Sequence, residues 1–155
     1  IPAVQPINNK DLTMIASGYG MRIHPIHKIP KFHAGMDFTA KVGTPIYATG
    51  DGRVTFADYS TNGYGMHVIV DHGFDYETLY AHMSVLKVKN GQRLQRGDLL
   101  GFVGNSGLSS GPHLHYEVHK GSEAVDPANY YFNDLTPEEY TRLLEISRNA
   151  GQSYD

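Results

Sequence analysis

The feature that most constrains this chain is a succession of short strand-like runs between Val42 and Val118. The runs are rich in aliphatic, β-branched and aromatic residues, and clusters of Gly, Asn, Asp and Ser separate them. Short strands at such a spacing are typical of an all-β sheet or sandwich. We therefore expect a mainly β fold.

One helix is expected after the strand-rich part of the chain. Thr136 is a typical N-cap residue, Pro137 takes the first helical position, and Glu139 stands three residues after the cap. This combination marks a helix start. Apolar and small side chains then recur along one side, and Gly151 can end the helix. We expect the helix, Thr136–Arg148, to pack on the sheet or on a neighbouring element.

The length of 155 residues suits one domain of ordinary size with a real core. The sequence shows no internal repeat and no second domain. We divide it into an N-terminal lead-in over residues 1–16, a main domain over residues 17–133, and a C-terminal helix and tail over residues 134–155.

Charge and composition exclude several classes of function. The net charge is -3, and the Lys and Arg residues are scattered along the chain. Neither a nucleic-acid-binding surface nor a basic membrane-binding patch is therefore expected. No apolar run is long enough to span a bilayer. The chain opens on Ile1-Pro2 without an initiator Met or a signal peptide, and we expect that an export signal or anchor has been removed.

The absence of cysteine limits the chemistry that the chain can perform. Disulfides and thiolate metal sites are excluded, so any metal ion would be held by His, Asp or Glu. The chain has nine histidines. His72 begins a turn that it can hold by a hydrogen bond, and His119 is expected to be exposed near a strand end. Structural or solvated roles are expected, taken singly, for His24, His27, His67, His72 and His119.

The segment Gly111–Val118 places two imidazoles on one face of a predicted strand. Successive side chains of a strand point to opposite faces. Leu114 and the apolar residues that alternate with it therefore share a core face, while His113, His115 and Glu117 share the other. Glu117 either orients one of these imidazoles or is only a structural carboxylate, and both interpretations stay open.

A second cluster consists of His33 and Asp37. A helix would place both on one face, but Gly35 and the flanking loop signals favour a bent, strand-like segment that can also bring them together. With one histidine of the His-x-His pair, they would supply the three ligands of a catalytic zinc ion. The other histidine of that pair and His82 could then take a proton and stabilise an oxyanion.

All these residues stand in motifs that resemble those of the M23 peptidases, the lysostaphin- and LytM-like zinc metalloendopeptidases that cut peptidoglycan. The resemblance covers most of the chain, from about Ser17 to Phe132. The matching motifs are Ser17-Gly18-Tyr19-Gly20-Met21-Arg22 with His24-Pro25, His33-Ala34-Gly35-Met36-Asp37, Gly43-Thr44-Pro45-Ile46-Tyr47-Ala48, Gly52-Arg53-Val54, Tyr80-Ala81-His82, Gly104-Asn105-Ser106-Gly107, Gly111-Pro112-His113-Leu114-His115-Tyr116-Glu117 and Val125-Asp126-Pro127.

The resemblance implies an antiparallel β-sheet core of the lysostaphin-like, duplicated hybrid motif type, with a groove over the sheet. It implies one zinc ion per chain, held by His33, Asp37 and His115. It also implies that His82 and His113 act as a catalytic pair on the attacking water and the tetrahedral intermediate. The sequence does not say which of the two is the general base.

The same resemblance makes residues 17–133 a catalytic domain whose loops wall the groove. The expected walls are Tyr19–Pro30, Ser60–Gly65 and Gly104–Gly111. Arg22 and Tyr64, which lie in two of these loops, are candidate substrate-binding residues.

The implied function is a zinc-dependent endopeptidase that hydrolyses peptide bonds in peptidoglycan stem peptides or cross-links. The C-terminal helix and the lack of a wall-targeting domain favour a periplasmic or cell-envelope enzyme that cuts D-alanyl–diaminopimelate bonds. The helix is then a candidate contact for an envelope protein. The alternatives are a glycyl-glycine endopeptidase, a structural metal site, and an inactive module that activates a cell-wall amidase. All five site positions are present, which favours an active enzyme over the inactive module.

Overall fold

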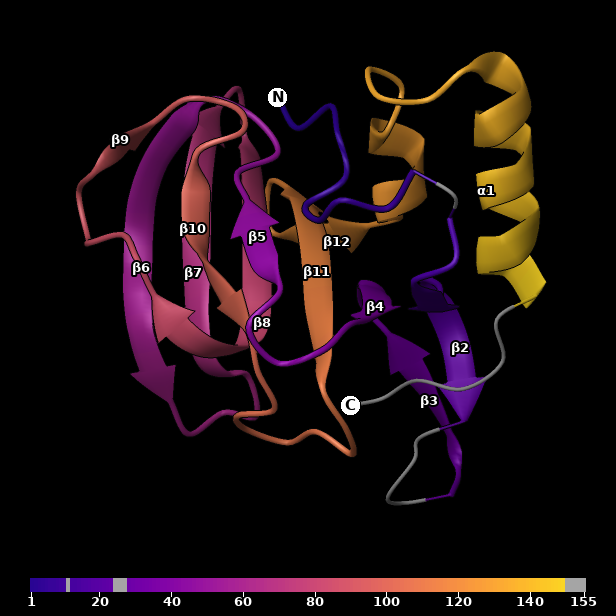
Figure 1. Cartoon of the computed structure of the whole chain (residues 1–155), viewed down its shortest axis with the longest axis horizontal. Coiled ribbons are helices and arrows are strands. Elements are labelled where there is room, and N and C mark those ends of the chain that lie inside the picture. Colours follow the sequence, from indigo (N-terminus) through magenta and orange to yellow (C-terminus); the bar gives the residue numbers. More distant parts are fainter. Residues whose placement is uncertain (11, 24–27, 150–155) are drawn as a thin grey trace.

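The computed structural model describes residues 1–10, 12–23 and 28–149, and within them the chain forms twelve strands and two helices. Ten strands form one sheet and two form a separate ribbon, with antiparallel pairing throughout (Figure 1). The expected mainly β fold with a C-terminal helix is confirmed. The elements are β1 (Ile15–Ser17), β2 (Gly20–Ile23), β3 (Pro30–His33), β4 (Met36–Thr39), β5 (Pro45–Tyr47), β6 (Gly52–Ser60), β7 (Gly65–Gly73), β8 (Tyr76–Leu86), β9 (Arg93–Leu94), β10 (Leu99–Val103), β11 (His113–Lys120), β12 (Glu123–Val125), the 3-10 helix η1 (Pro127–Tyr130) and α1 (Pro137–Asn149).

The strand order places distant parts of the sequence side by side. β11 lies between β4 and β8 in the path β1-β4-β11-β8-β7-β6-β9. Outside this path, β10 pairs with β5 and β8, and β12 pairs with β11. Asp37 on β4 and Ala81 on β8 both lie directly opposite His115. Because directly opposed residues share a face of the sheet, the register alone brings Asp37 and His115 together.

The connection from β3 to β4 has the bend that Gly35 predicts. β3 pairs with β2 in the ribbon, whereas β4 belongs to the main sheet, and only Ala34 and Gly35 separate them. A Cβ atom on Gly35 would overlap the carbonyl oxygen of Tyr116. Only glycine permits this close approach, which turns the chain between His33 and Asp37.

The alternation along β11 is observed as predicted. Leu114, Tyr116 and Val118 have no exposed surface, and Leu114 lies opposite the equally buried Phe38. Burial of one such side chain stabilises the fold by about 1.5–3 kcal/mol. A slip by one residue would exchange the two faces of the strand, so these side chains fix its register.

Strand β8 changes partners at His82. Its N-terminal part pairs with β11 and β7, and its C-terminal part pairs with β10. Against β7 the register passes from Tyr80 opposite Val68 to Met83 opposite Met66, so β8 has one extra residue. This is a β-bulge. His82 stands in it with a φ of +60°.

Helix α1 begins with the predicted capping box. The Thr136 N–H donates to Glu139 Oε1 at 2.8 Å, and the Glu139 N–H donates to Thr136 Oγ1 at 3.1 Å. Leu143 and Ser147 are buried where the helix packs against β1 and η1. In the described part of the chain, no helix has the length and apolarity needed to cross a membrane.

Both ends of the described chain contribute to the core, which the sequence did not reveal. Ile7 from the lead-in and Leu143 from α1 belong to the same buried cluster as the strands. The Gln5 N–H also donates to Asp134 Oδ2 at 3.0 Å, linking the lead-in to the segment before α1. The boundaries that we drew at residues 16 and 133 stay predictions.

Candidate metal centre and groove

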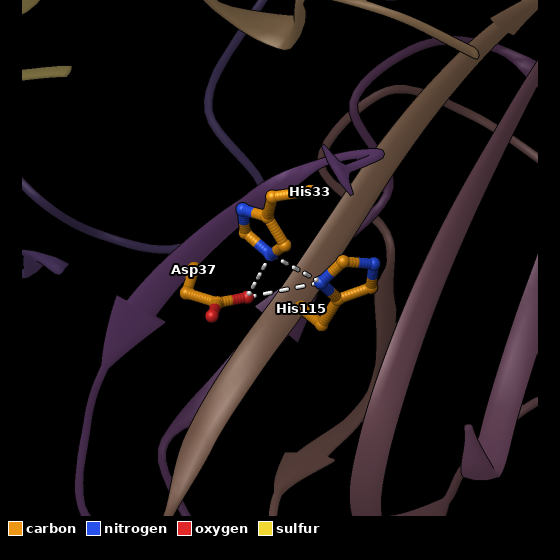
Figure 2. A group of neighbouring side chains, drawn as sticks. All are labelled: His33, Asp37 and His115. Carbon is orange, nitrogen blue, oxygen red and sulfur yellow. Dashed lines mark hydrogen bonds and ion pairs between the residues drawn. The ribbon is translucent and has the colours of Figure 1, made fainter. Parts of the chain in front are cut away.

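Three predicted ligands converge on the face of the sheet opposite the core. His33 Nε2 lies 3.1 Å from Asp37 Oδ1 and 3.2 Å from His115 Nδ1, and the last two atoms are 2.9 Å apart (Figure 2). All three side chains are buried. His113, the other histidine of the pair, has its Nε2 3.7 Å from Asp37 Oδ1. The three predicted ligands, His33, Asp37 and His115, thus come from β3, β4 and β11 respectively.

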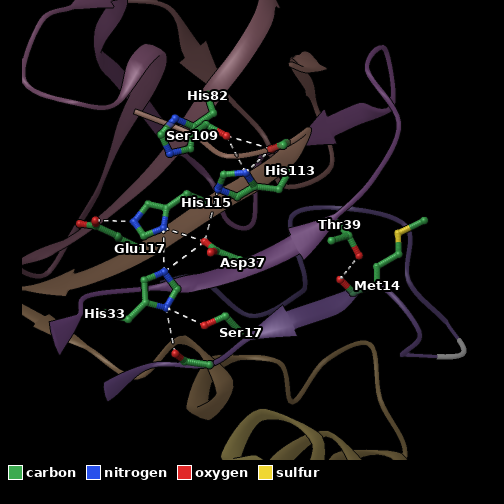
Figure 3. Close-up of polar contacts among 12 residues, drawn as sticks. Met14, Ser17, His33, Asp37, Thr39, His82, Ser109, His113, His115 and Glu117 are labelled. Atoms are coloured by element: carbon green, nitrogen blue, oxygen red, sulfur yellow. Dashed lines mark hydrogen bonds and ion pairs between the residues drawn. The ribbon is translucent and has the colours of Figure 1, made fainter. Parts of the chain in front are cut away.

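The far nitrogen of each ligand imidazole is held by an oxygen. His33 Nδ1 donates to the Gly18 carbonyl oxygen at 2.9 Å, and His115 Nε2 donates to Glu117 Oε2 at 2.7 Å (Figure 3). Carbonyl and ionised carboxylate oxygens only accept, so the far nitrogens carry the protons. In the neutral form of each ring, the near nitrogens, His33 Nε2 and His115 Nδ1, then present lone pairs to Asp37 and to each other.

Three acceptors that face one another at 2.9–3.2 Å need a cation among them. The donor set of two imidazoles and one carboxylate suits zinc and similar divalent ions. Catalytic zinc sites use three protein ligands of this kind and keep a further position open. The residues present therefore fit a catalytic divalent metal ion.

Glu117 connects the metal centre to the wall of the groove. Besides His115, it accepts hydrogen bonds from His119 Nε2 at 2.6 Å and from the Tyr64 hydroxyl at 2.7 Å. Burial by itself raises the pKa of Glu117, but the hydrogen bonds from these three groups hold that pKa well below its ordinary value. The geometry favours the interpretation in which Glu117 orients a ligand imidazole. His119 is only 28% exposed, because Glu117 holds it, so our expectation of an exposed residue was wrong.

The second pair of histidines lies beside the ligands. The His82 and His113 rings are buried, and their centroids are 4.7 Å apart. His82 Nδ1 donates to the Ser106 carbonyl oxygen at 2.7 Å, and His113 Nδ1 donates to the Gly111 carbonyl oxygen at 2.8 Å. Ser109 Oγ lies 3.0 Å from the same His113 nitrogen (Figure 3). One glycine-rich loop thus holds both rings through Nδ1, which leaves the lone pair of each on Nε2.

The backbone at His82 is strained. A φ of +60° is uncommon for a residue with a side chain and costs about 1–2 kcal/mol. Two hydrogen bonds hold this conformation: the His82 N–H donates to the Tyr64 carbonyl oxygen at 2.9 Å, and the Gly104 N–H donates to the His82 carbonyl oxygen at 3.0 Å. Such strain clusters at functional sites. Strand β8 continues through the bulge to Leu86.

An open cavity lies over the metal ligands, between three segments of the chain. Its walls are β3, the loop after β6 and the loop after β10. The last two fall within the expected walls Ser60–Gly65 and Gly104–Gly111, whereas the described lining of the third side comes from Lys31–Ala34 and not from the expected wall Tyr19–Pro30. The Tyr64 ring, besides its bond to Glu117, stacks on His115 at a centroid distance of 5.9 Å. Its lining includes Lys31, Phe32, His33, Asn62, Tyr64 and Leu108.

Some predicted residues fall outside what the structure describes. The backbone of Arg22 lies in β2, but its side chain is outside the described part of the molecule, and so are His24, His27 and Gly151. Ser109 and the carbonyl groups of Gly18 and Ser106 were not identified from the sequence. Backbone carbonyl contacts carry no residue signature, so no sequence signal could have found the last two.

Two further described histidines, His67 and His72, pack or bond within the fold. His72 is buried, and its Nδ1 donates to the Asp51 carbonyl oxygen at 2.8 Å, so it holds a neighbouring turn rather than its own. The His67 ring stacks on Phe56 at 4.5 Å. Burial is the main cause that lowers the pKa of both imidazoles.

Comparison with known proteins agrees with the fold and the site. Residues 31–127 match the model of Peptidase family M23. The peptidoglycan DD-endopeptidase ShyA of Vibrio cholerae is 43% identical over 97 residues, which cover 63% of this chain and 22% of that protein. The chain spans about a quarter of the length of the curated relatives that it matches.

Two solved structures share the fold. The catalytic domain of lysostaphin from Staphylococcus simulans is 28% identical with a TM-score of 0.71, over 79% of this chain and 94% of that one. A zinc-containing peptidase from Vibrio cholerae is 31% identical with a TM-score of 0.69, over 81% of this chain and 38% of that one. The expected lysostaphin-like fold is confirmed.

Proposed function

This chain belongs to peptidase family M23, and we propose from this premise that it is a zinc-dependent endopeptidase that cuts peptide bonds of peptidoglycan. The observation that carries the proposal is the convergence of His33, Asp37 and His115, whose potential metal-binding atoms lie 2.9–3.2 Å apart, beside a second pair of imidazoles. The zinc-containing peptidase of Vibrio cholerae supports the choice of metal. The name of ShyA supports the class of substrate.

In this mechanism His33, Asp37 and His115 hold one zinc ion per chain. Bound zinc would polarise the scissile carbonyl group and lower the pKa of water to about 7. One imidazole of the pair His82 and His113 accepts a proton from the attacking water and passes it to the leaving amine. The other imidazole of the pair, protonated at Nε2 as well as at Nδ1, would donate a hydrogen bond to the developing oxyanion.

Neighbouring groups keep these side chains in the required tautomers. The Gly18 carbonyl and the Glu117 carboxylate fix the protons on the far nitrogens of the ligand imidazoles. The loop carbonyl groups of Ser106 and Gly111 do the same for the catalytic pair. The two ligand imidazoles and the general base therefore turn a lone pair toward the chemistry before substrate arrives, which reduces the reorganisation that the reaction requires.

We also propose the D-alanyl–diaminopimelate bond as the bond cut, rather than a glycyl-glycine bond. The printed name of the ShyA relative, a DD-endopeptidase, supports this choice. Residues 17–133 would form the catalytic domain and act outside the cytoplasm, in the periplasm or cell envelope, with α1 as the candidate contact for an envelope protein. A structural metal site would use four protein ligands, and the open cavity over three ligands supports catalysis instead.

The experiment that tests the function is digestion of purified peptidoglycan, followed by mass spectrometry of the released muropeptides. The protein is assayed as purified, after removal of metal by a chelator, and after addition of zinc. We expect loss of hydrolysis in chelator, recovery with zinc, and products with a free D-alanine carboxyl group. Full activity in chelator would overturn the metal assignment, and products cut between glycines would overturn the bond assignment.

A further inference from the structure

The groove has a positive mouth on a chain whose net charge is -3. Lys31 of β3 lines the cavity, two residues from His33. The sequence from residue 12 to residue 36, which includes the ribbon β2–β3, contains no acidic residue. The wall segments 60–65 and 104–111 contain no charged residue at all. Among the three walls, only the ribbon therefore contains charged residues, and all of them are basic.

No carboxylate of the described chain neutralises this charge. Among the described residues that line the cavity, Glu117 is the one carboxylate, and it already accepts from His115, His119 and Tyr64. Lys31 is exposed and has no ion-pair partner within the part of the chain that the structure describes. The ammonium group remains available to a ligand.

The geometry of a strand relates Lys31 to the metal centre. Lys31 and His33 are two residues apart on β3, so they share a face and are separated by about 6.6 Å along the strand. An extended peptide in the groove has the same rise per residue. Lys31 therefore lies level with a substrate residue about two positions from the bond at the metal centre.

We propose that Lys31 forms a carboxylate-binding subsite that selects anionic peptides over uncharged ones such as polyglycine. The inference rests on the proposed endopeptidase function and names the class of substrate that its groove accepts. A carboxylate near the scissile bond forms a charge-assisted hydrogen bond with the Lys31 ammonium group. Because the site is open to solvent, we expect this hydrogen bond to contribute at the lower end of the usual range for charged groups, which corresponds to about tenfold in kcat/KM.

The test uses two cross-linked muropeptide dimers as probes. One has a free carboxylate on the diaminopimelate residue that precedes the scissile D-alanine, two positions from the bond, and the other has a carboxamide there. The zinc-loaded protein is compared with Lys31→Gln and with Lys89→Gln, a matched change of an exposed lysine in the connection to the distant strand β9. Circular dichroism confirms that each variant is folded.

We expect the unchanged protein and Lys89→Gln to cut the carboxylate dimer about tenfold better in kcat/KM, mainly through KM. Lys31→Gln should cut both dimers at the carboxamide rate, and the preference of the unchanged protein should fall with added salt. Equal cleavage of the two dimers by the unchanged protein, or a retained preference in Lys31→Gln, would overturn the subsite and leave the peptidase function standing. Cleavage of neither dimer by the zinc-loaded protein would overturn the proposed function itself.

Discussion

Strand β11 contributes to a buried polar cluster on each of its two faces, and the hydrogen bonds of the two clusters are arranged differently. On the groove face, the metal centre brings His33, Asp37 and His115 together. On the core face, a chain of hydroxyl groups ends on an imidazole, and we call it the hydroxyl network. Its members are Tyr116, Thr49, Tyr80, Thr78 and His72.

In the hydroxyl network each donor meets an acceptor. The Tyr116 hydroxyl donates to Thr49 Oγ1 at 2.9 Å, and the remaining contacts, 2.7–3.1 Å long, lead through Tyr80 and Thr78 to His72 Nε2. Only a neutral imidazole can accept at Nε2 while it donates at Nδ1. Burial lowers the pKa of His72, which agrees with that state. The chain alone satisfies this network.

In the metal centre three acceptors meet without a donor among them. The two clusters have similar burial and similar distances, so neither property separates a structural polar group from a functional one. The direction of the hydrogen bonds does separate them. A cluster that the chain cannot satisfy by itself indicates a ligand, here a cation.

The largest expected effect separates the two kinds of histidine at the site. His115→Ala removes a ligand, so we expect loss of zinc and a fall of hydrolysis to the uncatalysed level. His82→Ala removes one member of the catalytic pair, so we expect retained zinc with hydrolysis about 10²–10⁴-fold slower. Metal analysis by mass spectrometry and turnover on muropeptides measure both. Equal loss of zinc in the two variants would show that the roles are assigned wrongly.

On the core face, Thr49→Val should cost stability without any effect on chemistry. The change leaves the buried Tyr116 hydroxyl without its acceptor, and we expect a loss of about 1–3 kcal/mol in the free energy of unfolding. Urea denaturation measures it, with zinc content and turnover unchanged. Thr55→Val, at an exposed threonine of β6, is the control and should shift stability by no more than about 0.5 kcal/mol. A loss of zinc in Thr49→Val would mean that the two clusters are not independent.

The smallest effect tests the conflict among acceptors directly. In metal-free protein, Asp37→Asn introduces an amide that can donate to the lone pair of a ligand histidine. We expect this variant to lose zinc binding but to gain about 1 kcal/mol of stability in the absence of metal. Thermal unfolding in chelator measures the gain. A less stable metal-free variant would contradict the proposed arrangement of lone pairs.

Local rules explain what the sequence predicted. The alternation of apolar and polar residues predicted which side chains lie on each face of β11. Gly35 predicted the bend before Asp37, and Thr136 with Glu139 predicted the start of α1. Each of these features depends on residues within a few positions of one another.

The features that the sequence did not predict depend on distant partners. Thr49 and Tyr116 are 67 positions apart in the hydroxyl network, and Tyr64 reaches Glu117 across 53 positions. The strain at His82 arises where β8 passes from one partner strand to another. No local pattern encodes such pairings, because the order of strands in the sheet decides them.

The loop after β10 has a consequence for how new specificities can arise on this fold. It holds the rings of both His82 and His113 and is tied to the loop after β6, because the Leu108 N–H donates to the Gly63 carbonyl oxygen at 2.8 Å. A mutation that reshapes this wall therefore disturbs catalysis at the same time. The ribbon on the other wall pairs only with itself in the described structure. The ribbon carries the ligand His33 at the end of β3, so its exposed positions before His33 are the ones where substitutions can alter the groove wall and leave the catalytic pair in place.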